Sequence, residues 1–138
     1  MQIPNGFKPH FRKSDFTAPW EPIYSNILPD RVQLGLTIAP PHTNSRGFVH
    51  GGLIAALSDN TMGITCGVAL GDGARLVTAS LVTDFISSGE IGEWLLFDAE
   101  VLKAGGRLCF AQCIVKANDR LIARASATFS VVRKKTAN

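Results

Sequence analysis

The pattern of apolar and polar positions predicts a strand near the start of the chain. Residues 32–38 place Val, Leu, Leu and Ile at every second position, which is typical of a strand with one buried face. Two prolines follow at positions 40 and 41 and are expected to end the strand. Residues 1–30 carry five of the seven prolines, with aromatic residues between them. We interpret them as an extended arm with a short helical turn near residues 20–25, and not as a separate domain.

Residues 51–70 form the longest helical candidate. Apolar side chains at positions 53, 54, 57, 64 and 68 follow a period near 3.6, and small residues fill many of the other positions. A helix that is apolar on nearly every side is expected to be enclosed by other elements. The glycines at positions 71 and 73 are expected to end it.

Four strand-length segments rich in Val, Ile, Leu, Phe and Thr follow the helix, at residues 75–86, 94–102, 108–117 and 122–132. Gly, Ser, Asn and Asp between them are typical turn residues, so we expect these strands to form a meander. One enclosed helix needs a sheet that curls around it. The predicted fold class is therefore α+β, with a curled antiparallel sheet around one long helix and residues 31–138 as a single domain.

Composition and charge narrow the class of protein. With 138 residues, of which 46% are hydrophobic and 18% charged, the chain has the profile of one globular core, which excludes disorder and coiled coil. The net charge of +3 comes from scattered basic residues and a short run at 133–135, so we expect no nucleic-acid partner. No uninterrupted apolar run reaches about 18 residues, and no apolar leader begins the chain. We therefore expect no membrane partner and a cytoplasmic location.

The cysteines and histidines predict neither a disulfide nor a metal site. Cys66, Cys109 and Cys113 lie in apolar stretches without a paired spacing, which favours buried thiols in a reducing compartment. The three histidines are not at ligand spacing to any cysteine. We expect no metal and no other cofactor.

Two glycines, Gly51 and Gly52, stand at the predicted start of the helix. The first N–H groups of a helix have no acceptor within it, and glycine leaves them unshielded. Such a helix end attracts an anion, or an oxyanion that develops during a reaction. The alternative is that the glycines only allow close packing against a strand.

Asp59 lies in the middle of the predicted helix, among apolar residues. A carboxylate is costly to bury there, which favours a general base or nucleophile in a poorly hydrated site. The alternative is a kink, or the cap of a second, shorter helix. Asp59 follows Gly51 by eight residues, which is about 12 Å along a helix axis. One carbonyl carbon cannot contact both groups, so their joint action requires two copies of the chain in a symmetric dimer.

Three further residues are candidates for the same chemistry. His50, beside the glycines, is either a general acid or base or a residue that fixes the loop by hydrogen bonds. Asn44 either polarises a carbonyl group or satisfies the loop that follows the two prolines. Thr78, judged by composition alone, is a β-branched residue of a strand.

The spacing of Asn44, Gly47, the run 50–52 and Asp59 resembles the motif of the PaaI-like acyl-CoA thioesterases of the hotdog fold. The later runs 85–93 and 101–106 resemble the same family, and the resemblance covers about residues 42–130. It implies a hotdog fold paired into dimers, commonly dimers of dimers. It also implies hydrolysis of acyl-CoA thioesters without a metal or organic cofactor.

The resemblance further implies a role for each matched residue. The Gly51 amide would bind the thioester oxygen, with Asn44 and His50 supporting that end of the site. The partner's Asp59 would activate water or attack the thioester directly, and Thr78 would orient the water or the carboxylate. The remaining matched positions would meet the substrate and its CoA moiety: Gly52, Ser87, Ser88, Lys103, Gly106 and Arg107.

We therefore expect an acyl-CoA thioesterase that hydrolyses an aryl or medium-chain acyl-CoA to the free acid and CoA. A hotdog dehydratase is one alternative, although the chain lacks the Asp-x-x-x-x-His order of hydratase-type relatives. A non-catalytic acyl-CoA binding module is another, although a binder gains nothing from a buried Asp59.

Overall fold

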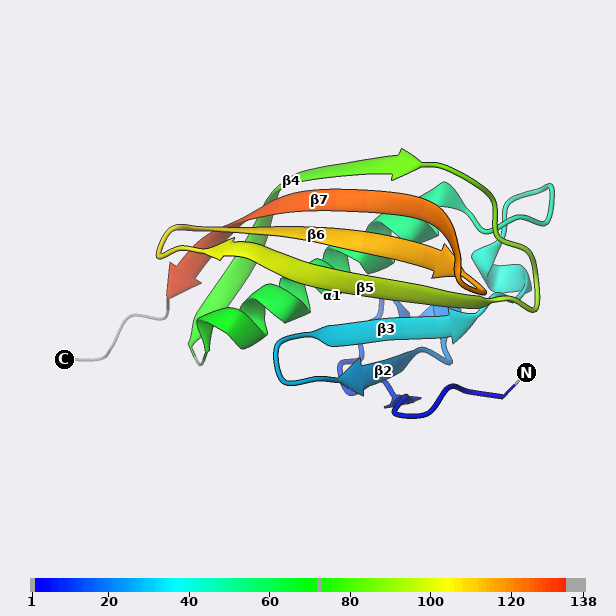
Figure 1. Cartoon of the computed structure of the whole chain (residues 1–138), viewed down its shortest axis with the longest axis horizontal. Coiled ribbons are helices and arrows are strands. Elements are labelled where there is room, and N and C mark those ends of the chain that lie inside the picture. The colour runs from blue at the N-terminus through cyan, green and yellow to red at the C-terminus, as the bar shows by residue number, and fades with distance from the viewer. Residues whose placement is uncertain (1, 72, 134–138) are drawn as a thin grey trace.

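A computed structural model shows one long helix lying against one antiparallel sheet (Figure 1). It describes residues 2–71 and 73–133, so Asp72 and most of the basic run at 133–135 lie outside the described residues. The helix α1 (Gly51–Leu70) has the predicted bounds. The sheet has the strand order β1-β2-β3-β5-β6-β7-β4 and curves over the helix. The predicted α+β class, a curled antiparallel sheet around one long helix, is confirmed.

The strands predicted from the sequence are present, with ends shifted by at most two residues. Two short 3-10 turns, η1 (Ala18–Trp20) and η2 (Pro40–His42), lie in the arm and before the helix. The strands are β1 (Lys8–Pro9), β2 (Tyr24–Ile27), β3 (Val32–Thr37), β4 (Ala74–Phe85), β5 (Trp94–Ala104), β6 (Leu108–Ala117) and β7 (Arg120–Arg133).

The N-terminal arm contributes two strands to the sheet, so the predicted helical turn at residues 20–25 is wrong. The only helical turn in this part of the described chain ends at Trp20, and β2 begins four residues later. β2 pairs antiparallel with β3, with Ile27 opposite Val32. The Leu28 N–H donates to the Arg31 carbonyl at 2.9 Å and closes the turn between them. Backbone pairing with a neighbouring strand, which a local pattern does not register, decides the conformation here.

The predicted four-strand meander is correct only for β5, β6 and β7. These three are antiparallel neighbours joined by short turns, whereas β4 lies beyond β7 at the edge of the sheet (Figure 1). The helix α1 is a crossover connection between β3 and β4, so it carries the chain beneath the sheet to the opposite edge. β4 therefore pairs with β7 on one side only.

The core lies between α1 and the inner face of the sheet. Nine helix residues are buried, and the fully buried strand residues include Phe97, Leu95, Val115 and Ile122. Cys66, Cys109 and Cys113 are buried in the same core without disulfides, as predicted. The face of α1 that the sheet leaves partly uncovered carries Ala55, Ala56, Asp59, Asn60 and Gly63.

By length and mean hydropathy the helix could also cross a membrane. The search for uninterrupted apolar runs in the sequence did not detect this, because small polar residues interrupt the apolar ones. An 18-residue window of α1 has a hydropathy of 1.4. Half of that window is buried inside the fold. The apolar side chains of α1 are used for packing against the sheet, as in the core helix of a globular domain.

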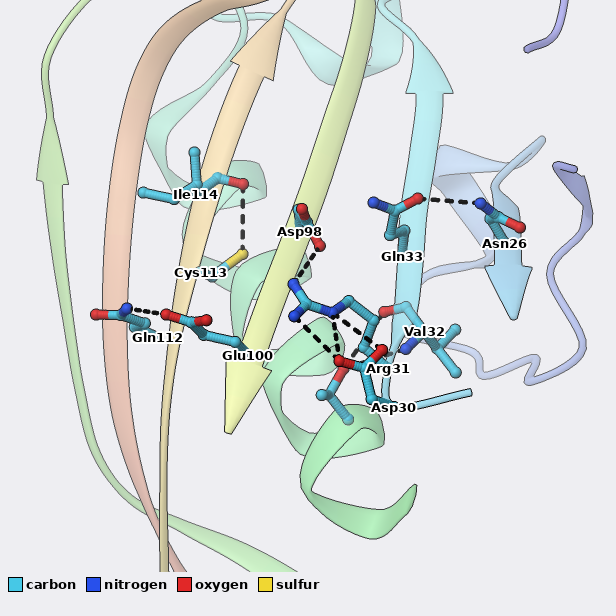
Figure 2. A network of polar contacts seen from close by, with 11 residues as sticks. Asn26, Asp30, Arg31, Val32, Gln33, Asp98, Glu100, Gln112, Cys113 and Ile114 are labelled. Atoms are coloured by element: carbon cyan, nitrogen blue, oxygen red, sulfur yellow. Dashed lines mark hydrogen bonds and ion pairs between the residues drawn. The ribbon is translucent and has the colours of Figure 1, made fainter. Parts of the chain in front are cut away.

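Polar contacts fasten the β2–β3 turn to the rest of the domain (Figure 2). The Arg31 guanidinium donates to Asp30 and, at 3.2 Å, to Asp98 of β5. The Thr65 hydroxyl lies 3.4 Å from both the amide nitrogen and the carbonyl oxygen of Val32 and joins α1 to β3. These contacts hold the arm and β3 in place beside the helix.

Two glycines give a test of the packing. A Cβ built on Gly35 in β3 would overlap the Trp94 indole ring, whereas a Cβ on Gly67 in α1 would meet nothing within 4 Å. We expect Gly35→Ala to lower the free energy of unfolding by about 1–3 kcal/mol through overpacking. Gly67→Ala should raise it by about 0.5–1 kcal/mol, because alanine restricts the unfolded chain. Urea denaturation midpoints measure both effects, and equal stability of the two variants would contradict this packing.

Candidate active site

Asp59 and Thr78 form the polar centre of the candidate site. Asp59 is half-buried on the partly uncovered face of α1, and the Thr78 hydroxyl of β4 donates to Asp59 Oδ1 at 2.7 Å. The β4–β7 register shifts between Thr78 and Ser80, immediately after the residue that meets the carboxylate. α1 continues through Asp59 without interruption, so the alternative of a kink or a second helix is wrong.

A cavity of about 740 Å³ opens over Asp59 and Thr78. Its lining continues along α1 through Gly63 and Gly67, where the absence of side chains leaves the helix surface open. Other helix residues, including Asn60 and Ile64, also line the cavity. Further lining residues come from β4, from Phe129 of β7, from Val32 and Ile27, and from Phe11 and Arg12 of the arm. The carboxylate therefore faces a space large enough for an organic substrate.

The start of α1 holds the second group of predicted residues. His50 is the N-cap, and its Nδ1 accepts a hydrogen bond from the Gly52 amide at 2.8 Å. The Gly51 N–H has no acceptor outside the helix among residues 2–71 and 73–133, and its position in the first turn leaves it without an acceptor within the helix. A Cβ on Gly51 would lie 3.2 Å from the Phe85 ring, so the glycine also allows this close approach.

Asn44 shapes the loop before the helix. Its carboxamide oxygen accepts from the amides of Arg46 at 2.9 Å and Phe48 at 3.2 Å. Its own backbone N–H donates to the Phe48 carbonyl at 2.8 Å. These bonds agree with the alternative in which Asn44 satisfies hydrogen-bonding groups of the loop. The carboxamide nitrogen stays available to a ligand.

One chain does not bring Gly51 and Asp59 together. They are eight residues apart on an uninterrupted helix, which places them about 12 Å apart along its axis. The cavity over Asp59 does not reach the helix start, where a separate cavity of about 370 Å³ is lined by Phe16, Trp20, His50 and Gly52 among others. Within one chain, Gly51 and Asp59 therefore lie at separate places along the helix.

The predicted CoA-binding positions also fall into two groups. Ser87 and Ser88 follow β4 at the end of the molecule where α1 begins, and both are exposed (Figure 1). Arg120 holds this loop, since it donates to the Ser88 carbonyl and, at 3.0 Å, to the Glu93 carboxylate. The same guanidinium lowers the pKa of Glu93.

The other group lies at the opposite end of the sheet. Lys103, Gly106 and Arg107 belong to the hairpin between β5 and β6, which is remote from the start of α1 (Figure 1). All three are exposed, and Arg107 is tied to the fold through its carbonyl, which accepts from the Val131 amide at 2.8 Å. One chain does not bring this hairpin beside Ser87 and Ser88.

The pattern of the sequence missed the contribution of the arm. Phe11 and Arg12 line the cavity that holds Asp59, although residues 1–30 lie outside the motif. No spacing rule connects them to Asp59, because they reach it through the pairing of β1 with β2 and of β2 with β3. In the part of the chain that the structure describes, no cluster of three His, Cys, Asp or Glu residues is arranged to hold a metal ion.

The sequence is similar to those of known thioesterases and esterases. A sequence model described as the thioesterase superfamily matches residues 46–123. A Pseudomonas aeruginosa protein named as an esterase is 32% identical over 94% of this chain and 97% of its own length. Human acyl-coenzyme A thioesterase 13 is 35% identical over 72% of this chain and 71% of its own length.

A solved structure agrees with the fold. A Streptococcus mutans protein bound to acetyl CoA superposes with a TM-score of 0.70 at 25% identity, over 78% of this chain and 85% of that one. The matched range 46–123 contains the start of α1, Asp59, Thr78, the loop with Ser87 and Ser88, and the β5–β6 hairpin. The chain belongs to the thioesterase superfamily and has its hotdog fold.

Proposed function

We propose that this thioester hydrolase cleaves aryl or medium-chain acyl-CoA to the free acid and CoA, at a site that two chains share. The observation that carries the proposal is the Asp59 carboxylate, held by Thr78 at 2.7 Å and facing a cavity of about 740 Å³. Acyl-CoA is supported as the substrate by the names of the human relative and of the acetyl CoA complex.

The β4 edge supports a dimer. β4 is twelve residues long, and its outer edge has no partner strand among the described residues. Exposed apolar side chains follow it, with Val77 58%, Val82 55% and Phe85 57% exposed. A long apolar edge strand is a template for pairing with another chain. A second copy is the occupant that this edge fits, because antiparallel pairing of identical strands closes a two-fold dimer.

The same pairing would complete the site. Thr78 and Phe85 are seven residues apart, about 24 Å along one strand. In an antiparallel pair centred between Leu81 and Val82, Thr78 lies opposite the partner's Phe85. Since Phe85 packs beside Gly51 and Thr78 bonds Asp59 within each chain, the pair brings the Gly51 amide of one protomer toward the Asp59 of the other. The homodimer thus removes the 12 Å separation.

In this dimer each group has a defined task. The Gly51 N–H donates to the thioester carbonyl oxygen and stabilises the charge that develops there. In one route Asp59 takes a proton from water, and the water oxygen attacks the carbonyl carbon. In the other, the carboxylate attacks and forms an anhydride that water opens. Either way the C–S bond breaks and CoA leaves as the thiolate, which takes up a proton.

The remaining residues support these steps. Thr78 fixes the Asp59 carboxylate by its hydrogen bond, and His50 caps the helix whose first amide binds the oxygen. Arg107, together with Lys103 and Gly106, would meet the CoA moiety, where the guanidinium pairs with a phosphate. Ser87 and Ser88 would contribute from the other end of the molecule.

We also propose a cytoplasmic location for the enzyme. Three buried free thiols are compatible with a reducing compartment. Burial raises the pKa of Cys113 to about 12, so this thiol stays protonated and unreactive at neutral pH.

Asp59→Asn tests the central assignment. The change keeps the size of the side chain but removes its charge and basicity, so we expect kcat for octanoyl-CoA or benzoyl-CoA to fall by about 10²–10⁴ while the fold remains. Thiol release and thermal melting are measured on the same preparation. A well-folded variant with near wild-type kcat would contradict the assignment of Asp59 and make His50 the candidate general base.

Thr78→Val tests whether the hydroxyl orients the carboxylate. Valine keeps the shape and loses the 2.7 Å hydrogen bond to Asp59, so kcat should fall about 10-fold, the effect of one hydrogen bond to a charged group. Thr78→Ser, which retains the hydroxyl, is the matched control and should keep most of the activity. If both variants behave alike, the hydroxyl has no such role.

Val82→Lys tests the dimer. A lysine near the centre of β4 should oppose pairing of two edges, so the variant should be monomeric by light scattering and lose most activity. Ile114→Lys is the control, because β6 lies between β5 and β7 and has no free edge. This control also replaces an aliphatic residue by lysine, and the variant should remain dimeric. An active Val82→Lys monomer would show that one chain suffices.

A further inference from the structure

A second, smaller cavity lies between the arm and α1, next to the one that holds Asp59. It has a volume of about 140 Å³ and shares Arg12, Asn60 and Ile64 with the larger cavity. Its other lining residues include His10, Ser14 and Thr17 of the arm, together with Ile23, Leu34 and Leu57 of the core. Asn60 follows Asp59 on the helix, so the small cavity begins beside the carboxylate.

His10 is the most unusual residue of this small cavity. His10 is only 6% exposed, and its Nδ1 has no hydrogen-bond partner among the described residues. A buried polar atom without a partner is rare in folded proteins and costs free energy. Burial, the largest influence, lowers the pKa of His10, so the imidazole is neutral at physiological pH. A neutral imidazole nitrogen either donates or accepts a hydrogen bond.

Two further polar groups at this place are also unengaged. Within residues 2–71 and 73–133, neither the exposed Arg12 guanidinium nor the half-buried Asn60 carboxamide has a hydrogen-bond or ion-pair partner. The next residue, Lys13, behaves differently, since its ammonium group donates to Glu21 at 3.1 Å. The hydroxyls of Ser14 and Thr17 bond each other at 3.0 Å. Three polar side chains that line this cavity, buried His10, half-buried Asn60 and exposed Arg12, are therefore free to bind a polar group that enters it.

We propose that this small cavity binds the far end of the acyl group, and that the preferred substrates carry a hydroxyl or carboxylate oxygen there. This inference rests on the proposed thioesterase function. An acyl group attacked beside Asp59 reaches the small cavity across Asn60, which with Arg12 and Ile64 lines both spaces. The guanidinium donates to the oxygen, and the carboxamide and His10 Nδ1 complete its hydrogen bonds.

The size of the space agrees with such a group. A water molecule occupies about 30 Å³ in the liquid, so 140 Å³ holds a hydroxyl or carboxylate group with the carbon that bears it. Sites that hydrogen-bond a substrate oxygen discriminate strongly against the analogue without it, because their polar groups are then left unpaired. The N-terminal arm is in this way a specificity element of the enzyme.

The test compares three CoA thioesters of equal chain length, those of octanoic acid, 8-hydroxyoctanoic acid and octanedioic acid. We expect the wild-type enzyme to favour an oxygenated thioester over octanoyl-CoA by at least about 10-fold in kcat/KM. Arg12→Met and Asn60→Leu keep the side-chain volume and remove the polar group, so each should bring that ratio down toward 1. Lys13→Met is the matched control and should keep it.

Binding of the three hydrolysis-resistant thioether analogues, measured by calorimetry, separates this inference from the proposed function. No thiol release from any acyl-CoA would overturn the function, and the three Kd values would still decide the selectivity. Equal kcat/KM and equal Kd for the three ligands in the wild type would overturn the inference and leave a cavity that holds only water. A selectivity that persists unchanged in Arg12→Met and Asn60→Leu would assign it to other residues and overturn it as well.

Discussion

The rigid helix α1 is the constraint on which the rest of the structure depends. It carries the free amide of Gly51 at its start and the Asp59 carboxylate in its middle, and its regular backbone keeps them about 12 Å apart. No side-chain movement can close that distance. If both groups act on one carbonyl group, as we propose, they must come from two copies of the chain.

The sheet determines which parts of the helix remain accessible. It buries the faces of α1 that carry Leu53, Leu57, Met62 and similar residues, and leaves the Asp59 face partly uncovered. The crossover formed by α1 places β4 beside that face and at the edge of the sheet. In β4, Thr78 donates to the Asp59 carboxylate, and the outer edge of the strand has no partner strand among the described residues, which is the edge we propose for dimer pairing.

The arm shows how a segment outside the family motif becomes part of a site. Its two strands extend the sheet beyond β3, and this brings His10, Phe11 and Arg12 against the exposed helix face. In the proposed mechanism the reacting groups lie on the helix and not on the arm, so residues of the arm can differ without loss of the chemistry. Selectivity for the acyl group is a natural use of such a segment.

The sequence by itself determined the elements whose signals are local. The apolar period, the flanking glycines and the β-branched runs located α1 and strands β3 to β7 within two residues, and the spacing of Gly51 and Asp59 on one helix predicted that their joint action needs two chains. Only the tertiary structure decided the position of β4 beyond β7, the pairing of β2 with β3, the bond between Thr78 and Asp59, and the approach of Arg12. These contacts join residues far apart in the chain, and they depend on which edges and faces meet after packing. A local pattern records the period of one element and carries no information about its neighbour.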